Sequence, residues 1–552
     1  MGVPEEHDRL LSPQQQQPFA DPPKQPLWQR IKDSHDSGSL RHRIKRILGI
    51  LVFLSIVLIF LGFNMSGPEY RKHIIDKSPI RIPDMDGRDL EWHPNKSCRD
   101  TPHKGPKETF YADLASSRVL LIEQAIQKKG WNAPSSPMPH VDGEVILRPT
   151  SASKAALEVE IITNYEDMGI DIEFETRGHT DHLKITTPRQ SPEFSRDACI
   201  QIRVTAWIPQ KAIVNALAVN TVSLNLFVQE GLAMGAENSV DFTTVSGDMV
   251  LPDDGSVEPY KIESPDYKYT TVSGDIKGWF PMYHKLKITT VSGDVRAQVK
   301  HKDIVLSSNV PSLLEVASVS GTVTVQDGSE AADYDVPARD HLVKLHTTSG
   351  DIAAKVYTGS SSEFSSTSGD LQIDLVPVFD ERWLRSSWRP LLKSSTTSGS
   401  HRITIKEPLF VEIRNELYPG RRPNLPKTEQ PEEPNKINVD DISVITDDNK
   451  DEPETQDIKR RRVAKNNRGL TSLESLHSSI SGNMRLFYPA SWEGSFSASS
   501  MSSDIAFRGK DVIVEKKRGG LINKEVSGHK GDGSSTLKIN ELSGDVMVWI
   551  GW

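Results

Sequence analysis

Apolar and polar residues alternate on both sides of a short turn sequence, Thr-Thr-Val-Ser-Gly-Asp, which the chain repeats. It stands at Thr243–Asp248, Thr270–Asp275 and Thr289–Asp294. An apolar residue lies five positions before the glycine and another lies two positions after it, as with Phe242 and Met249. Alternation with a period of two on either side of a turn predicts a strand, a turn and a second strand in every copy.

Ten Ser-Gly pairs fall in this frame, and such an internal repeat determines how the rest of the chain is interpreted. Successive glycines from Gly247 to Gly399 are 27, 19, 28, 29, 19 and 30 residues apart. A coil of about 19 residues with an occasional extra loop predicts a β-solenoid in which each copy stacks on the preceding one. The later copies are Ala317–Thr322, His346–Asp351, Ser365–Asp370, Ser395–Ser400, Ser478–Asn483, Glu525–His529 and Glu541–Asp545.

The turn residues have predicted roles of their own. Glycine is expected to supply a positive φ, and the following aspartate to bond back to backbone amides nearby in its own turn. Stacked carboxylates could instead hold calcium, but the calcium-binding nonapeptide spacing is missing, so no metal is predicted. The repeat-turn residues are Gly247, Asp248, Gly274, Asp275, Gly293, Asp294, Gly350, Asp351, Gly369, Asp370, Gly544 and Asp545.

The position two residues before each glycine predicts an exposed apolar stripe. Strand parity places the residues five, three and one before the glycine in the interior, with the serines among them, so the intervening residue faces outward. Its first four occupants are Val245, Val272, Val291 and Val319, and an outward row of valines is typical of a contact surface. The alternative is that the turn breaks the parity and these valines belong to the core.

The Ser-Gly-Asp strand repeats resemble the putative adhesin family, the β-solenoid domains of bacterial and fungal surface proteins. The resemblance covers roughly residues 200–410 and 475–550 and implies a mainly β, single-chain β-solenoid or β-helix-like ectodomain. It implies an adhesin-like role in surface or lumenal interaction, with an unknown protein or glycan as ligand. A shared fold alone does not determine a function.

The N-terminal part predicts membrane attachment. Residues 1–46 are polar and proline-rich, which predicts a disordered tail, and residues 47–67 form an almost wholly apolar run that could cross a bilayer. Arg41, Arg43, Lys45 and Arg46 precede that run, so the positive-inside rule places the N-terminus in the cytoplasm. The prediction is a single-pass type II protein with an uncleaved signal anchor and an extracellular or lumenal C-terminal part.

Two features suit a lumenal environment. Asn95 begins an Asn-Lys-Ser glycosylation sequon, and the only two cysteines, Cys98 and Cys199, both follow the anchor. A disulfide between them is permitted there, while a free buried thiol at Cys199 is an equally ordinary interpretation.

The remaining boundaries follow from changes in composition. Residues 68–140 are predicted to be a stalk with a short helix over about 108–127, and residues 141–422 and 469–552 to be the solenoid repeats. Between them, residues 423–468 are acidic and then basic, which predicts a disordered insertion. The basic cluster at 459–462 balances the acidic run, or is a dibasic processing site.

No catalytic signature accompanies the repeats. The chain of 552 residues has a net charge of −9 and no evident basic face, which argues against nucleic-acid binding. His179 and His182 are spaced to lie on opposite faces of a strand, and a solvated turn is the expected environment for them. The function predicted is therefore a non-catalytic interaction module without cofactors. The alternatives are a carbohydrate-active enzyme on a β-helix and a purely structural cell-surface spacer.

Overall fold

The computed structural model describes part of the chain in detail, and all of that part belongs to one compact unit, Tyr70–Trp552. The described residues are 98, 103–127, 138–189, 197–252, 259–302, 310–327, 336–337, 339–380, 389–411, 469–520 and 523–551. The predicted tail at 1–46, the anchor at 47–67 and the insertion at 423–468 lie outside them. Among the described residues, none forms a helix with the length and apolar character of a membrane span.

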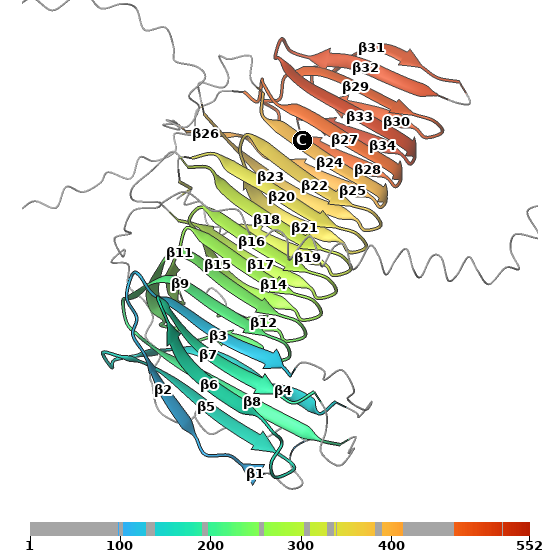
Figure 1. Cartoon of the computed structure of the whole chain (residues 1–552). Helices are drawn as coiled ribbons and strands as arrows, with labels where there is room; N and C mark the ends of the chain where they lie inside the picture. The colour runs from blue at the N-terminus through green and yellow to red at the C-terminus, as the bar shows by residue number, and fades with distance from the viewer. Residues whose placement is uncertain are drawn as a thin grey trace, which may run out of the picture. The chain divides into compact units, whose positions relative to one another are not determined.

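The described structure is mainly β and consists of two long sheets that lie face to face (Figure 1). The first sheet contains β1 (His103–Lys104), β2 (Glu108–Ala112), β4 (His140–Thr150), β5 (Ala155–Thr163), β8 (Cys199–Pro209), β10 (Asn225–Val228), β12 (Met249–Val250), β15 (Ile276–Met282), β17 (Val295–His301), β19 (Val323–Asp327), β21 (Ile352–Thr358), β23 (Leu371–Asp380), β25 (His401–Ile405), β26 (Leu409–Val411), β28 (Met484–Tyr488), β30 (Ile505–Gly509) and β34 (Val546–Ile550).

The second sheet contains as many strands and carries the residues that precede each turn. Its members are β3 (Val119–Ile126), β6 (Asp171–Arg177), β7 (Thr180–Thr187), β9 (Ala212–Thr221), β11 (Ala233–Thr244), β13 (Lys261–Glu263), β14 (Asp266–Thr271), β16 (Lys285–Thr290), β18 (Ser312–Ser318), β20 (His341–Thr347), β22 (Ser361–Ser366), β24 (Leu391–Ser398), β27 (Glu474–Ser481), β29 (Gly494–Ser500), β31 (Ile513–Arg518), β32 (Lys524–Lys530) and β33 (Ser535–Ser543).

Each repeat forms one coil, which runs along a strand of the second sheet, through the turn and back along a strand of the first sheet. Successive coils pair in parallel and in register: Tyr269 of β14 lies opposite Ile288 of β16, which lies opposite Val316 of β18. These are the residues five positions before the turn glycine. The solenoid-like fold is therefore confirmed, and so is the register that the alignment of the glycines predicted.

The core lies between the two sheets and is continuous from coil to coil. The second sheet contributes the row of residues five before each glycine, and the first sheet contributes Met249, Ile276 and Val295, all without solvent-exposed surface. A single coil has no partner for its apolar face, so burial of the core depends on stacking.

The last coils do not stack in chain order. The coil β33–β34 lies between β27–β28 and β29–β30, because β33 pairs with both β27 and β29 while β34 pairs with both β28 and β30. Beyond β29 the sheet continues with β32 and then β31, both antiparallel to their neighbours. Stacking of every copy on its predecessor is therefore wrong for this end.

One predicted repeat is not a turn at all. Glu525–His529 lies within β32, where Val526 is buried and Gly528 pairs across to Phe496. A different segment supplies the missing turn. Met501–Asp504 follows β29, and Ser500 Oγ at the end of β29 accepts a hydrogen bond from the Ser503 amide. Serine replaces the glycine there, so this turn does not contain the Ser-Gly pair of the other copies.

The helix predicted over 108–127 is also wrong, because this stretch forms β2 and β3. Residues 119–125 alternate between half-buried and buried, and β3 is inserted between β7 and β9 as a parallel strand. Tertiary pairing overrides the helix propensity of its Leu, Glu, Gln and Ala residues. The β-structure therefore begins at His103, within the predicted stalk of residues 68–140 and before the expected boundary at 141.

The structure joins Cys98 to Cys199 in a disulfide with a Cα–Cα distance of 5.7 Å. Both cysteines are buried and pack against Ile162 of β5. The bond fastens the segment before β1 to the start of β8, at the first end of the stack. Of the two interpretations left open by the sequence, the structure has the bonded one.

Candidate functional site: the turn face of the solenoid

The turns form ladders that run along the stack, and each residue of the repeat has a distinct position in them. Three residues before the glycine, a buried Thr or Ser accepts a hydrogen bond from the glycine amide. Thr271 Oγ1 lies 2.9 Å from the Gly274 nitrogen and Ser366 Oγ lies 2.8 Å from the Gly369 nitrogen. This bond closes each turn from the inside, as an ST-turn does.

The glycine is required by contact with the preceding coil and not by a positive φ. A Cβ added to Gly274 would lie 1.9 Å from the carbonyl oxygen of Gly247, and one added to Gly293 would lie 1.8 Å from that of Gly274. None of the predicted repeat-turn glycines has a φ in the positive region: Gly247, Gly274, Gly293, Gly350, Gly369 and Gly544 all lie outside it. The predicted positive φ is therefore wrong for them, and the closeness of successive turns explains the glycine.

The aspartates bond from coil to coil and not within their own turn. Asp248 Oδ1 accepts the amide of Asp275 at 2.9 Å, and Asp275 Oδ1 accepts the amide of Asp294 at 2.8 Å. The same bond joins Asp351 to the amide of Asp370 at 2.8 Å. Each carboxylate therefore satisfies a backbone donor that the turn leaves unpaired, which corrects the expected local cap.

The serine before the glycine is exposed, so the prediction that it faces the interior is wrong. Ser292 Oγ donates to the Val272 carbonyl at 3.1 Å and Ser320 Oγ donates to the Val291 carbonyl at 3.2 Å. The backbone turns at this position, and the outward serine hydroxyl bonds to the preceding coil. The alternation of inward and outward side chains therefore ends at the residue two before the glycine, and the serine no longer follows it.

The predicted apolar stripe faces outward. Val245 is 43% and Val319 is 38% exposed, while Val272 and Val291 between them are half-buried. We call the whole row of residues two before the turn position the turn stripe. In spatial order it consists of Val222, Val245, Val272, Val291, Val319, Thr348, Thr367, Thr397, Ile480, Leu542 and Met501.

The turn stripe has a polar border on both sides. On one side lie the serine and aspartate ladders. On the other side lies a row of mainly threonine and serine residues, four positions before the glycine, and beyond it a row of charges that pair between coils. Lys268 bonds to Asp241 at 3.1 Å and Lys393 bonds to Glu363 at 2.7 Å. An apolar centre with a polar rim is the arrangement found in protein interfaces.

The last part of the turn stripe borders an open groove of about 560 Å³. Its walls include the side chains of Thr367, Thr397, Ile480 and Leu542, with His346 at one end. The lining is mostly hydroxyl groups and aliphatic carbon, together with His346, Asn540 and Glu541, which suits an extended chain or a sugar ring.

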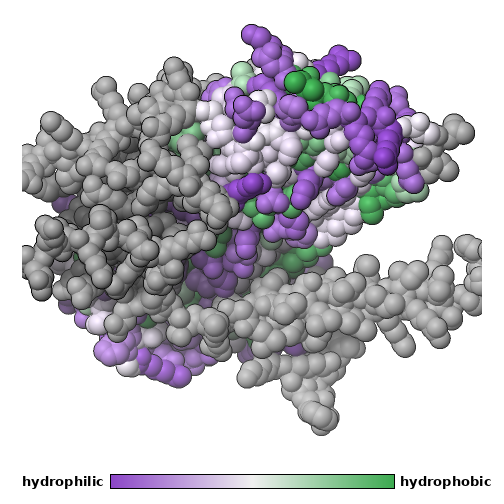
Figure 2. Space-filling view, turned by 90° about the horizontal axis from the view of Figure 1, so that it is seen from above, coloured by the Kyte–Doolittle hydropathy of each residue, from purple (hydrophilic) through white to green (hydrophobic). Residues whose placement is uncertain are grey.

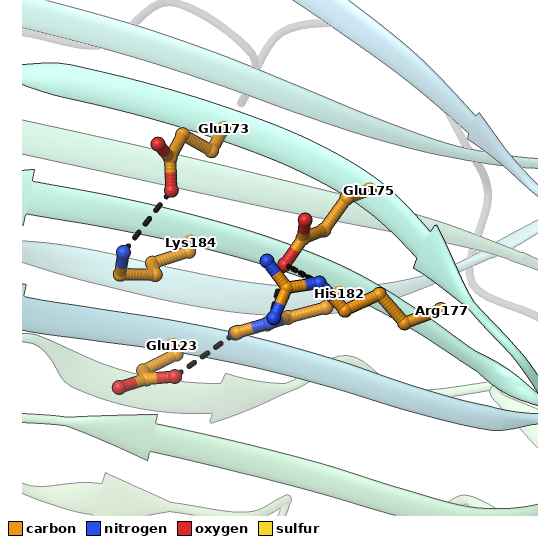
Figure 3. A network of polar contacts seen from close by, with 6 residues as sticks. All are labelled: Glu123, Glu173, Glu175, Arg177, His182 and Lys184. Carbon is orange, nitrogen blue, oxygen red and sulfur yellow. Dashed lines mark hydrogen bonds and ion pairs between the residues drawn. The ribbon is translucent and has the colours of Figure 1, made fainter.

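A polar network lies on the outer surface near the first end of the second sheet (Figure 3). His182 of β7 lies 2.9 Å from Glu123 of β3 and 3.9 Å from Glu175 of β6, and Lys184 bonds to Glu173 at 3.0 Å. The segment that contains His182 is a strand and not the solvated turn expected from the sequence. In the part of the chain that the structure describes, no group of three His, Cys, Asp or Glu residues could hold a metal ion.

A second group of titratable residues is enclosed in the core. His301 Nε2 lies 2.5 Å from Asp327 Oδ2, and the His301 ring packs against that of His341, which bonds to Ser312 Oγ at 2.9 Å. Burial lowers the pKa of His301 and of His341 well below the usual range and raises the pKa of Asp327 well above it. These residues resemble catalytic ones in type, but solvent hardly reaches them, which favours a structural role.

Asn95 and the basic cluster at 459–462 lie outside the described residues. The repeat-turn residues and the four valines, in contrast, are all brought to one face. Sequence reasoning found that face through the repeat itself. It missed Met501 and Val222, whose turns have Ser503 and Leu224 in place of glycine.

A family model described as Toastrack DUF4097 matches residues 153–407, which include most of the repeats before the insertion. No curated protein matches the chain. Five chains among the solved structures match it.

Three of these structures are named for adhesion or lipid binding. A "putative cell adhesion protein" from Clostridium sporogenes is 7% identical over 80% of this chain and 98% of its own, with a TM-score of 0.15. A "putative lipid binding protein" from Parabacteroides distasonis is 13% identical over 56% and 93%, with a TM-score of 0.25. A "putative adhesin" from Parabacteroides merdae is 9% identical over 57% and 98%, with a TM-score of 0.14. At these scores the similarities indicate neither a shared ligand nor a shared activity.

Proposed function

Starting from a Toastrack-type repeat domain over residues 153–407, we propose that this protein is a non-catalytic interaction module that binds through the turn stripe. The observation that carries the proposal is the unbroken outward row of aliphatic and threonine side chains. Neighbouring members are about 4.8 Å apart, the spacing of paired strands. A flat, regular surface of this kind can hold a long partner at many points, each of which contributes little.

The turns support this proposal because their polar groups are already used. The serine hydroxyls donate to carbonyl groups of the preceding coil and the aspartate carboxylates accept amides of the following coil, so the face presents chiefly apolar surface to a partner. A contiguous row of exposed apolar side chains is typical of contact sites in soluble domains.

Photo-crosslinking tests the proposal without knowledge of the ligand. The full-length protein in its own membrane carries a benzophenone amino acid at Val245 or Val319, and irradiation is followed by identification of the adducts. The expected result is an adduct from both positions, formed with another chain or with residues 1–97 of the same chain. The matched control positions are Thr324 and Gln372, exposed residues on the first sheet.

The control decides between specific contact and random collision. Equal adduct yields from the turn stripe and from the control positions would overturn the proposal, as would no adduct from Val245 and Val319. An adduct confined to the turn stripe identifies the occupant directly by mass spectrometry.

Two other functions remain as alternatives to be tested. A carbohydrate-active enzyme would show turnover in a glycan-degradation screen, and the groove beside Thr367 is where a sugar ring would fit. A purely structural spacer would give no adduct at either face. The chemically inert residues of the turn stripe favour binding over catalysis.

The proposal includes the position of the module in the cell. The charge pattern around residues 47–67 supports a type II signal anchor, and the Cys98–Cys199 disulfide supports an oxidising compartment for the β-domain. The module would then be displayed outside the cell or in a lumen, with the N-terminus in the cytoplasm.

A further inference from the structure

A second groove lies at the opposite edge of the solenoid from the turn stripe. The strand β9 begins beside this groove at Ala212 and ends at Thr221, next to Val222 of the turn stripe. At about 3.3 Å per residue, the groove and the turn stripe are therefore about 30 Å apart. The groove has a volume of about 740 Å³, which lies within the range of roughly 300–1,000 Å³ that is usual for small-molecule sites.

Segments at the ends of several strands form this groove. They are the end of β2 with Asp113 and Leu114, the turn between β4 and β5, and the turn between β8 and β9. Thr150 Oγ1 accepts the Ala152 amide at 3.1 Å, which closes the first turn. The Gln210 amide donates to the Thr150 carbonyl at 3.3 Å and so joins the second turn to the first. The backbone around the groove is therefore held in place by its own hydrogen bonds.

Tyr111 gives the groove an aromatic wall. It is 67% exposed, more than any other large hydrophobic residue in the described part of the chain. A tyrosine has an apolar ring and a polar tip, so it can pack against a ring of the ligand while its hydroxyl group forms a hydrogen bond. Ser151 and Ser153, both exposed, also line the groove, and a hydroxyl group both donates and accepts. These residues suit a ligand with a ring and several hydroxyl groups, as in a carbohydrate.

The charged residues of the groove are Asp113, Lys154 and Lys211, and all of them are exposed. None of these side chains has an ion-pair or hydrogen-bond partner among the residues that the structure describes. The two ammonium groups favour a ligand with a negative charge, while the carboxylate accepts hydrogen bonds from hydroxyl groups of the same ligand. Because the net charge of the chain is −9, the attraction for an anion comes from these local cations and not from the protein as a whole.

The backbone of Lys211 is a second indication of a ligand. Its φ of 64° lies in the left-handed region, which lysine rarely adopts and glycine adopts freely. The Lys211 amide donates to the Ala233 carbonyl of the neighbouring coil at 2.8 Å, which holds the turn in this conformation. A glycine could form the same hydrogen bond without strain, so the fold does not require the lysine side chain. Strained residues of this kind cluster at functional sites.

We propose that this groove binds an acidic sugar residue of a glycan. The ring of Tyr111 packs against the sugar, Lys154 and Lys211 bind its carboxylate or sulfate group, and Asp113 accepts hydrogen bonds from its hydroxyl groups. The site is separate from the turn stripe, and the assignment does not rest on the function proposed for that stripe. A glycan in the groove and a partner along the turn stripe would occupy opposite edges of the solenoid.

Fluorescence anisotropy of labelled oligosaccharides, measured with the full-length protein in detergent micelles, tests the proposal. The probes are an oligogalacturonate, a sulfated heparin oligosaccharide and a neutral cello-oligosaccharide of the same length. The expected result is binding of at least one acidic probe and no binding of the neutral one, and the acidic probe that binds identifies the acid group. Lys154→Ala and Tyr111→Ala should each weaken this binding at least about tenfold, because each removes a contact with the ligand.

Lys211→Gly separates binding from stability. The acidic probe should bind at least about tenfold more weakly, because a charged hydrogen bond is lost. The melting temperature should change little, because the relief of strain offsets the greater freedom of glycine in the unfolded chain.

The matched controls lie at the other end of the stack, in the turn between β30 and β31. Asp511→Gly makes the same backbone change at a residue with a φ of 61°, and Lys510→Ala removes a cation from the same turn. Figure 2 looks onto that end and shows hydrophilic side chains there beside smaller hydrophobic patches, so non-specific attraction of a probe to polar surface would be detected. Both controls should bind the acidic probe as the wild type does.

Several outcomes would overturn the proposal. They are the absence of binding of both acidic probes to the wild type, equal affinity for the neutral probe, and unchanged affinity in Lys154→Ala and Lys211→Gly. An equal loss of affinity in Lys211→Gly and Lys510→Ala would show general attraction to cations and would overturn it as well. Loss of affinity in Val245→Thr, with the groove variants unaffected, would place the glycan on the turn stripe instead.

Discussion

The turn glycine illustrates how a single residue is selected by a neighbour in another coil. Its amide is held by Thr or Ser within its own turn, while its α-carbon lies against the carbonyl of the preceding glycine. The repeat showed that this position is glycine, and the expected reason was a positive φ. The actual reason is a contact between residues 19 to 30 positions apart, which local turn chemistry does not reveal.

This reason leads to a specific prediction for Gly293. Gly293→Ala should destabilise the protein by roughly 3 kcal/mol, because overpacking forces adjacent coils apart. Gly293→Asn should be no better, whereas a position that needed a positive φ would tolerate Asn. Urea denaturation followed by far-ultraviolet circular dichroism measures both changes.

The matched control for this prediction is Gly519→Ala. A Cβ at Gly519 meets no atom within 4 Å, and the residue has an ordinary φ. The free energy of unfolding of the Gly519→Ala protein should therefore change by no more than about 0.5 kcal/mol, as for a neutral surface substitution. A stable Gly293→Ala protein would contradict the close approach of the coils.

At the scale of the strands, the repeat determined what could be predicted. The register, the core rows and the outward turn stripe followed from the alternation around the glycine, because similar repeats can be aligned on one another position by position. The segment at 108–127 lacks a repeat, and its helix-forming composition led to the wrong element. Glu525–His529 has the turn sequence but lies within β32, since pairing on both sides decides the conformation of a strand.

The strands β25 and β27 contain buried histidines that make stability depend on pH, and Ser394 of β24 bonds to both of them. Ser394 Oγ lies 3.1 Å from His401 Nδ1 and 2.7 Å from His477 Nδ1. Burial lowers the pKa of His401 to about 4 and that of His477 to about 3, and the charge of His401 contributes to the latter. An unfolded histidine has a pKa of about 6.5, so below that pH the unfolded chain binds protons that the folded protein does not.

Stability should therefore be complete above pH 6.5 and fall as the pH drops toward 4. Each of the two histidines contributes a slope of up to about 1.4 kcal/mol per pH unit in that range. His477→Gln should make the decline of the urea midpoint shallower, and the exposed His346→Gln should leave it unchanged. Parallel declines in all three proteins would show that these buried histidines do not govern the acid sensitivity.

At the scale of the whole molecule, the type II arrangement remains a prediction, and it can be measured on intact membranes. A C-terminal tag should be protected from external protease in sealed microsomes, and the N-terminus should be cleaved. Asn95→Gln should increase the electrophoretic mobility by the mass of one glycan, because the sequon at Asn95 is predicted to face the lumen.

The matched control for the glycan shift is Asn64→Gln, which alters the sequon next to the predicted anchor. That sequon lies too close to the membrane to be used, so the mobility should not change. A cleaved C-terminal tag with a protected N-terminus would reverse the proposed orientation.

The order of the last coils has a consequence for synthesis. The coil Ser535–Ile550 is translated after Gly494–Gly509, yet it separates that coil from Glu474–Tyr488. On the ribosome, the earlier two coils therefore cannot stack in their final arrangement until the later one has emerged. If they pair prematurely, they must come apart again. The solenoid thus closes by insertion, and an arrested chain that lacks these residues exposes two unsatisfied strand edges for quality control to recognise.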